Sequence, residues 1–250
     1  MPHESRELRL AATLVEFTDT LTGDFDPALH SRRLADACVE FVGARGAGVT
    51  LLEPDGRPGP VVHGAGQPPP VRELLERERE SGPVRDSLVS GTEVLAAPLA
   101  SREAAARWPE FTTAARRSGI GAVYAVPLRR HATLAGAVSV HTARPAAAGE
   151  DLAIVRSLSA ATTVGLLNQR AHARHRTLSG QLREALASRV RIEQAKGMLA
   201  ERWRVSPDDA FETLRGYARG HRLPLDQVAR AVVHRALTDA QLRPGGPGTG

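Results

Sequence analysis

The side chains with the clearest chemical potential are cations gathered in the last third of the chain. Lys196 is the only lysine, and Arg215 and Arg219 stand one helical turn apart. Residues 1–175 hold 20 basic and 20 acidic side chains, whereas residues 176–250 hold 13 basic and 8 acidic ones. A positive excess confined to one segment is typical of a region that binds a polyanion. We therefore interpret the last third as a candidate interface with a polyanion such as nucleic acid. The alternative is a coding bias, since arginine and alanine are abundant and lysine occurs once.

The sequence contains no pattern of a known catalytic or metal site. It has no Walker phosphate loop, no His-Glu-x-x-His and no Gly-x-Ser-x-Gly. Cys38 is the single cysteine, which excludes an internal disulfide framework and a multi-cysteine zinc or iron–sulfur site. We interpret the remaining acid and hydroxyl groups as solvated helix faces: Glu73, Glu76, Glu80, Asp86 and Ser87. We expect no enzyme, no cofactor and no metal.

Length and composition indicate a soluble protein. The chain has 250 residues, of which 42% are hydrophobic and 24% charged, as in folded soluble domains. The longest nearly apolar run, 157–167, is too short to span a bilayer, and the N-terminus lacks the apolar core of a signal peptide. We expect a cytoplasmic protein without a membrane partner.

The first two thirds of the chain predict an α+β fold with a mostly antiparallel sheet flanked by helices. Helices are predicted over 8–17, 27–41, 71–80, from 82 onwards and over 101–117. Strands are predicted over 47–52, 59–63, 92–97, 119–128 and 134–141, and the first two form a hairpin. We expect the second helix to bury Leu29, Leu34, Ala37, Cys38 and Phe41.

From residue 149 the pattern stays helical as far as about Trp203. One face of this helix predicts a short coiled-coil seam, formed by Leu178, Leu182, Ala185, Arg189 and Ile192. A second helix starts at Ser206-Pro207, and a third follows Pro224. We expect a three-helix core of Ile192, Ala195, Leu199, Ala210, Phe211, Leu214 and Val228.

The motifs of 189–199, 210–218 and 225–229 resemble the ANTAR domain, a family of RNA-binding transcription antiterminators. The resemblance implies a three-helix fold whose dimer binds a tandem pair of RNA hairpins with six-base loops. Binding of both hairpins would exclude the overlapping terminator. Looped bases are readable, whereas the major groove of A-form RNA is too narrow.

We predict that RNA contacts come from Arg189, Gln194, Lys196, Gly197, Arg215, Arg219 and Arg222. Each assignment has an alternative. Lys196 could be a solvated charge, and Gly197 could serve helix packing alone. Arg215 and Arg219 could form salt bridges with Glu212 or Asp208 instead.

Residues 8–170 resemble a GAF domain through the segments 47–52, 82–94, 108–111 and 120–128 and the strand pair within 126–140. The resemblance implies a sheet with flanking helices and a small-ligand pocket on the sheet face away from the dimer helices. The sequence names no ligand. His63 and His141 are interpreted as structural or solvated rather than as haem ligands.

We expect a GAF-like sensor domain over 1–170, a helical connector over 171–185, an ANTAR domain over 186–238 and a disordered tail over 239–250. The predicted function is that of a homodimeric, signal-responsive antitermination regulator that binds tandem stem-loops in mRNA leaders. Two alternatives stay open. One is a DNA-binding regulator, although the third helix turns only Arg230 and Arg235 outward. The other is a metabolite-binding module whose C-terminal bundle only dimerises.

Overall fold

The computed structural model describes residues 5–18, 25–96, 98–144 and 149–242. The chain divides into two compact units, the N-terminal unit Met1–His172 and the C-terminal unit Ala173–Gly250. Helix α7 (Glu150–Trp203) contributes residues to both units. The long helix predicted to end near Trp203 is confirmed.

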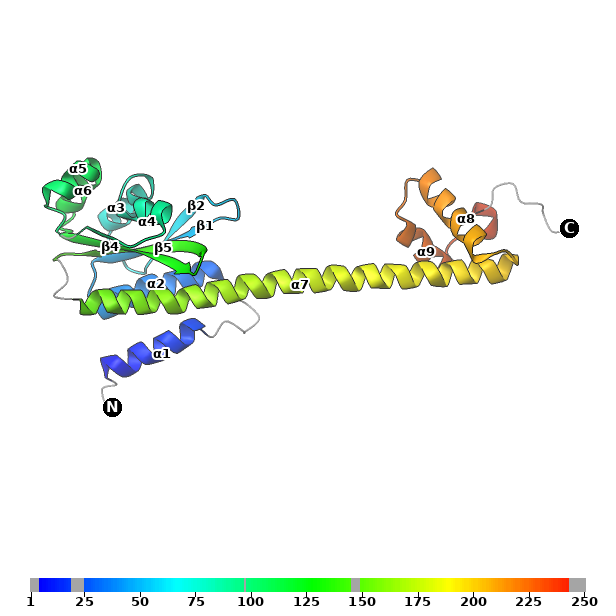
Figure 1. Ribbon diagram of the computed structural model, residues 1–250, viewed down its shortest axis with the longest axis horizontal. Coiled ribbons are helices and arrows are strands. Elements are labelled where there is room, and N and C mark those ends of the chain that lie inside the picture. Colours follow the sequence, from blue (N-terminus) through cyan, green and yellow to red (C-terminus); the bar gives the residue numbers. More distant parts are fainter. Residues whose placement is uncertain (1–4, 19–24, 97, 145–148, 243–250) are drawn as a thin grey trace. The chain divides into compact units, whose positions relative to one another are not determined.

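A five-stranded antiparallel sheet forms the centre of the N-terminal unit (Figure 1). The strand order is β2-β1-β5-β4-β3. The strands are β1 (Gly46–Leu52), β2 (Pro58–His63), β3 (Val94–Ala96), β4 (Ala122–Arg130) and β5 (Thr133–Thr142). A Cβ atom at Gly136 would collide with the backbone oxygen of Thr50, so β1 and β5 require glycine there. The predicted strands and the hairpin of β1 with β2 are confirmed.

Helices cover both faces of this sheet (Figure 1). On one face α1 (Arg6–Thr18), α2 (Pro27–Val42) and the first part of α7 pack around Leu34, Phe41 and Leu158. On the other lie α3 (Pro69–Glu80), α4 (Pro83–Ser90), α5 (Arg102–Arg107) and α6 (Pro109–Arg117). The unit therefore has an α+β fold with one core on each side of the sheet.

Two predictions for this unit are wrong in detail. Leu29 is 48% exposed, because α2 turns His30 and Ser31 inward instead. The predicted helix 101–117 is two helices that meet at Trp108. Pro109 follows Trp108, and a residue before proline is disfavoured in helical conformation, so the chain bends there.

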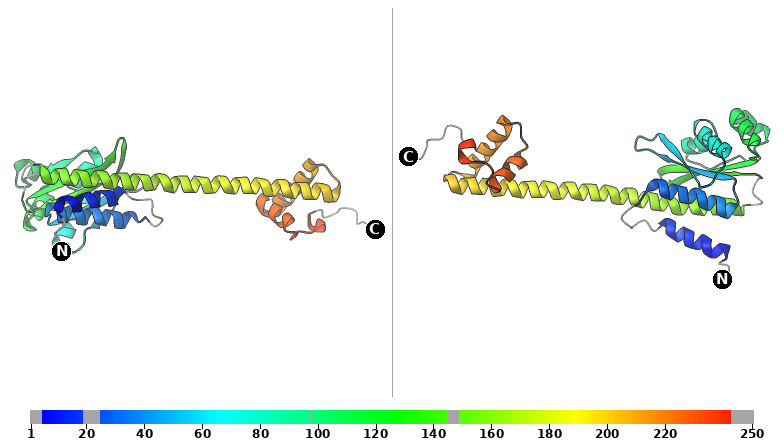
Figure 2. Two further views of the ribbon diagram at one scale, coloured as in Figure 1. Left: turned by 90° about the horizontal axis from the view of Figure 1, so that it is seen from below. Right: turned by 180° about the vertical axis from the view of Figure 1, so that it is seen from behind.

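The C-terminal unit is a small helical bundle (Figure 2). The end of α7 packs with α8 (Pro207–Gly220), α9 (Leu225–Val233) and α10 (Asp239–Leu242). Ser206 caps α8, since its Oγ accepts a hydrogen bond of 3.1 Å from the backbone nitrogen of Asp209. The buried core consists of Ala195, Leu199, Ala210, Leu214, Ala218, Val228, Ala229, Val232 and Leu242.

Phe211 and the tail differ from expectation. Phe211 is only half-buried, because α8 buries Ala210, Leu214 and Ala218 and leaves Phe211 at the edge of that face. Residues 239–242, which we assigned to the tail, form α10 and bury Leu242. The rest of the predicted tail, 243–250, lies outside the described residues. None of the described helices combines the length and apolar character that a membrane crossing requires.

Candidate nucleic-acid interface

Lys196 and Gly197 lie next to each other on α7. The ammonium nitrogen of Lys196 is 2.6 Å from Oε2 of Glu193, and the lysine side chain is 22% exposed. Gly197 is exposed, and a Cβ atom added there would meet no atom within 4 Å. Packing within this chain therefore does not require glycine at 197. The open surface beside Lys196 leaves room for close approach of another molecule.

Arg215 and Arg219 lie on one exposed face of α8 and share Glu212. Arg215 Nη1 is 3.3 Å from Oε1 of Glu212, and Arg219 Nη2 is 3.8 Å from Oε2. The alternative of salt bridges with Glu212 is thus realised in this structure. The two arginine side chains remain 52% and 65% exposed, so their other donors can reach a ligand. Ion pairs this exposed contribute little to stability.

Arg189 and Gln194 lie on the surface of α7 together with apolar neighbours. They line an open depression of about 550 Å³ with Leu186, Val190 and Glu193. Arg222 is exposed in the link between α8 and α9. Arg235 lies beyond the end of α9, so only Arg230 of the two predicted outward arginines belongs to that helix.

Exposed apolar side chains follow the α7 residues of the C-terminal unit at every fourth position. Leu178, Leu182, Leu186 and Val190 are 53%, 62%, 64% and 47% exposed. We call this set the α7 strip. The predicted seam shares Leu178 and Leu182 with it. An exposed apolar strip of this length usually marks a surface that another chain covers.

Arg191 is a residue that the sequence analysis missed. Its Nε donates to Oδ1 of Asp226 at 2.7 Å, and its Nη2 donates to Oδ2 of Asp226 at 3.0 Å. Nη2 also donates to Oε1 of Glu184 at 2.7 Å. The two acids raise the pKa of Arg191, mainly through the Asp226 bonds, and the same bonds lower the pKa of Asp226. Arg191 therefore clamps the start of α9 to α7.

A buried carboxylate lies between the sheet of the N-terminal unit and the helices α3 and α4. Glu78 of α3 is fully buried. Its Oε1 accepts from the backbone nitrogen of Val84 at 2.9 Å, and its Oε2 accepts from Oγ of Ser139 at 2.7 Å. Nε2 of His141 lies 2.8 Å from Oε2 of Glu78. His141 is also fully buried, which agrees with a structural role.

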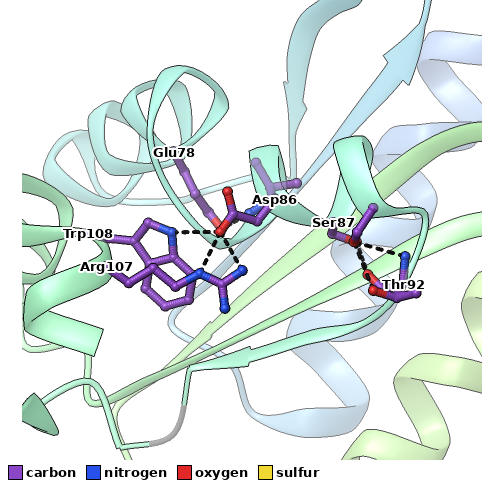
Figure 3. A network of polar contacts seen from close by, with 8 residues as sticks. Glu78, Asp86, Ser87, Thr92, Arg107 and Trp108 are labelled. Atoms are coloured by element: carbon purple, nitrogen blue, oxygen red, sulfur yellow. Dashed lines mark hydrogen bonds and ion pairs between the residues drawn. The ribbon is translucent and has the colours of Figure 1, made fainter. Parts of the chain in front are cut away.

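Asp86 joins α4 to the bend between α5 and α6 (Figure 3). Its Oδ2 accepts from Nε1 of Trp108 at 3.1 Å and from Nε of Arg107 at 2.8 Å. The guanidinium carbon of Arg107 lies 4.8 Å from the centre of the Trp108 ring. Ser87 is fully buried and donates to the backbone oxygen of Thr92 at 2.8 Å. The interpretation of Ser87 as solvated is wrong, since α4 packs that side on the core.

Comparison with protein families gives two matches that together span most of the chain. The GAF domain family matches residues 31–166, which is more than half of the chain, and the ANTAR domain family matches residues 180–233. The chain belongs to the GAF–ANTAR family. Its first domain is a sensor domain and its second a regulatory one. A search of curated proteins found no match.

Several crystal structures are similar to this GAF–ANTAR protein at low sequence identity. One is the GAF domain/HD domain protein from Geobacter sulfurreducens, with 17% identity over 60% of this chain and 97% of that chain and a TM-score of 0.45. Another is bacteriophytochrome RpBphP3 from R. palustris, with 14% identity over 78% of this chain and 44% of that chain and a TM-score of 0.48. A third is the GAF domain from Acinetobacter phosphoenolpyruvate-protein phosphotransferase, with 12% identity over 66% of this chain and 98% of that chain and a TM-score of 0.45.

The GAF domain has a depression between α3 and α6. Its volume is about 400 Å³, and it is lined by Pro70, Glu73, Leu74, Arg77, Ala114, Arg117 and Ser118. Arg77 pairs with Glu73 at 2.7 Å, while Leu74 is buried in the core below. Nε2 of His63, on β2, lies 2.9 Å from Oε1 of Glu76 on α3. This depression is formed by residues of α3, of α6 and of the chain just beyond α6, on the side of the sheet away from α7, where we expected a ligand pocket.

Proposed function

We propose that this GAF–ANTAR protein is a signal-responsive RNA-binding regulator of transcription antitermination. The ANTAR domain binds tandem RNA hairpins through Lys196, Arg215 and Arg219, aided by Arg189, Gln194, Gly197 and Arg222. The GAF domain senses a small ligand or a state of the cell. Binding of both hairpins keeps the terminator from forming.

The observation that carries this proposal is the coincidence of the ANTAR match with the positive excess of the chain. The match covers 180–233, and residues 176–250 hold 13 basic against 8 acidic side chains. Exposed arginines on α8 and an open surface beside Gly197 support an interface with phosphates and unpaired bases. The interface needs no catalytic group.

The α7 strip supports a homodimer, in which a second copy covers its leucines. Burial of Leu182 and Leu186 would remove large apolar side chains from water, and each contributes about 1.5–3 kcal/mol when fully buried. Two ANTAR domains in one particle would bind two hairpins at once. Leu182→Glu with Leu186→Glu is expected to yield monomers in analytical ultracentrifugation, whereas a dimer that survives these substitutions uses another surface.

RNA binding is tested by a mobility-shift titration of the full chain against an RNA with two six-base-loop hairpins. Lys196→Ala combined with Arg215→Ala is expected to weaken binding by roughly tenfold or more, as expected for the loss of two charged contacts. Arg72→Ala combined with Arg116→Ala removes the same charge from exposed sites of the GAF domain and serves as the matched control.

Three results would contradict the proposal in different ways. Equal binding by both double variants would refute the assignment of Lys196 and Arg215. Tighter binding to duplex DNA than to hairpin RNA at the same salt concentration would indicate a DNA-binding regulator. If the folded protein binds no nucleic acid, the result would favour a metabolite-binding module whose C-terminal bundle only dimerises.

A further inference from the structure

Three helices of the ANTAR domain, α7, α8 and α9, are each followed within two residues by an arginine in the left-handed backbone region. Arg204 follows α7 with φ 53°, Arg222 follows α8 with φ 55° and Arg235 follows α9 with φ 56°. We call these residues the helix-end arginines. Each helix closes with the same two hydrogen bonds, one from the arginine and one from the next residue. In each bond the backbone nitrogen of the first residue donates to the backbone oxygen of the second. The pairs are Arg204 and Glu201 (3.4 Å), Val205 and Ala200 (3.2 Å), Arg222 and Arg219 (3.2 Å), Leu223 and Ala218 (2.9 Å), Arg235 and Val232 (3.0 Å), and Ala236 and Ala231 (2.7 Å).

Glycine is the residue that this backbone shape favours, because a Cβ atom crowds the carbonyl in the left-handed region. The GAF domain follows that rule. Its helices α2, α4 and α6 are followed by Gly43, Gly91 and Gly119, with φ of 65°, 65° and 70°. The left-handed position after a helix is therefore occupied by glycine in the GAF domain and by arginine in the ANTAR domain. The arginines adopt this conformation at a cost in free energy.

Helix electrostatics do not account for arginine at these three positions. A cation near a helix C-terminus is attracted to the last carbonyl groups. The last turns of α7, α8 and α9 already hold Arg202, Arg219 and Arg230, in ordinary helical positions. A second cation at a strained backbone position adds little to this attraction.

The side chains of the helix-end arginines are available to a ligand. All three residues are exposed, and within the described part of the chain none of their guanidinium groups forms an ion pair. By contrast, Lys196 and Arg215 are held by neighbouring glutamates. Exposed guanidinium groups without an internal partner are suited to an external anion.

Arg235 lines a surface depression that has the right chemistry for such an anion. The depression has a volume of about 480 Å³ and is lined by Arg202, Arg235, Leu237 and Asp239. Nη1 of Arg202 lies 2.9 Å from Oδ1 of Asp239, so the carboxylate holds the Arg202 guanidinium in place. Two guanidinium groups against one carboxylate leave a net positive site. Arginine binds phosphate oxygens through two parallel hydrogen bonds.

We infer that the helix-end arginines contact phosphodiester groups of the bound RNA, with Arg235 and Arg202 holding one phosphate in their shared depression. The inference rests on the proposed RNA-binding function and adds Arg204, Arg235 and Arg202 to its interface. These arginines take the place of glycine because their charge is needed by the RNA and not by the fold.

The test uses fluorescence anisotropy of the full chain with labelled two-hairpin RNA over a series of salt concentrations, together with thermal unfolding. Arg204→Gly combined with Arg235→Gly removes two charges and the backbone strain. Arg204→Lys combined with Arg235→Lys keeps both charges and the strain. The unsubstituted protein must bind the RNA for the proposed function to stand.

The glycine variant is expected to bind roughly tenfold more weakly, with a log–log salt dependence less steep by about 1.5, since each lost phosphate contact lowers the slope by about 0.7–0.9. Its unfolding midpoint is expected to stay equal or rise by about 2–4 °C. The lysine variant is expected to stay within about threefold of the unsubstituted protein, because it keeps the charge.

Two results would overturn the inference while leaving RNA binding intact. One is a glycine variant with unchanged affinity and salt dependence. The other is a glycine variant that unfolds at a lower temperature, which would show that the arginines stabilise the helix ends. Absence of RNA binding by the unsubstituted protein would refute the proposed function and this inference together.

Discussion

Replacement of Glu78 by alanine is expected to be among the most damaging single changes in the GAF domain. The carboxylate is fully buried and has three partners on two elements, α4 and β5. The backbone nitrogen of Val84, Oγ of Ser139 and Nε2 of His141 lie 2.9, 2.7 and 2.8 Å from its oxygens. Glu78→Ala leaves all three of these groups inside the protein without their acceptor.

The magnitude follows from these contacts. A buried donor that loses its acceptor costs about 1–3 kcal/mol, and three buried groups lose the same carboxylate. We expect Glu78→Ala to lower the free energy of unfolding by about 3–5 kcal/mol. Glu78→Gln keeps the volume and one acceptor oxygen, so we expect about half that loss.

Denaturant unfolding followed by tryptophan fluorescence measures the effect. Trp108 is buried in the GAF domain and Trp203 lies in the ANTAR domain, so a Trp203→Phe background makes the signal report on the GAF domain alone. Glu80→Ala is the matched control, because Glu80 is an exposed carboxylate on the same helix and should change stability by less than about 0.5 kcal/mol. A loss below about 1 kcal/mol for Glu78→Ala would refute the reasoning.

Three further predictions concern other groups. Arg191→Ala is expected to lower the unfolding temperature of the ANTAR domain, because Asp226 loses its partner. Arg183→Ala, an exposed control on the same helix, should lower it less. Equal unfolding temperatures of the two variants in calorimetry would contradict a stabilising role of the Arg191–Asp226 pair. Burial lowers the pKa of His30, so the stability that its neutral form provides is complete above about pH 6.5 and is lost as the pH falls through the lowered folded value. His30→Gln should therefore flatten the decline in denaturant midpoint between about pH 7 and pH 5, and an unchanged decline would count against it. Burial raises the pKa of the Cys38 thiol to about 12, so Ellman's reagent should react slowly with folded protein, by about a thousandfold, and rapidly after denaturation.

Local sequence signals were sufficient for most elements of the fold. Asp26-Pro27 and Ser206-Pro207 set helix starts through a capping side chain and a proline, and both caps are formed. Continuous apolar runs in β4 and β5 indicated strands that the sheet contains, and both strands are buried along most of their length. These signals act within a few residues of one another, so they can be read directly from the chain.

Contacts between distant residues could not be predicted in this way. Glu78 lies among charged residues in α3 and reads as surface, because its partners Ser139 and His141 follow 61 and 63 positions later. Arg191 lies in the motif that resembles ANTAR, yet Asp226, its partner, is 35 positions away. Phe211 shows the limit of periodicity, since a residue beside the buried face can lie at its edge.

The structure gives the positions of the predicted RNA-binding residues, but it does not show which of them contact RNA. Arg215 and Arg219 share a face of α8, as their spacing required. Arg189 and Gln194 instead adjoin apolar side chains of the α7 strip. A second copy that covers the strip would compete with RNA for these two residues, whereas Arg215 and Arg219 lie on another helix.

The helix-end arginines also have a genetic consequence. Every arginine codon becomes a glycine codon by one base change, so a more relaxed backbone at 204, 222 or 235 is always a single mutation away. Selection for protein abundance alone would therefore favour glycine at these positions. A mutational scan scored once for cellular protein level and once for transcript output should therefore rank glycine high in the first list and low in the second.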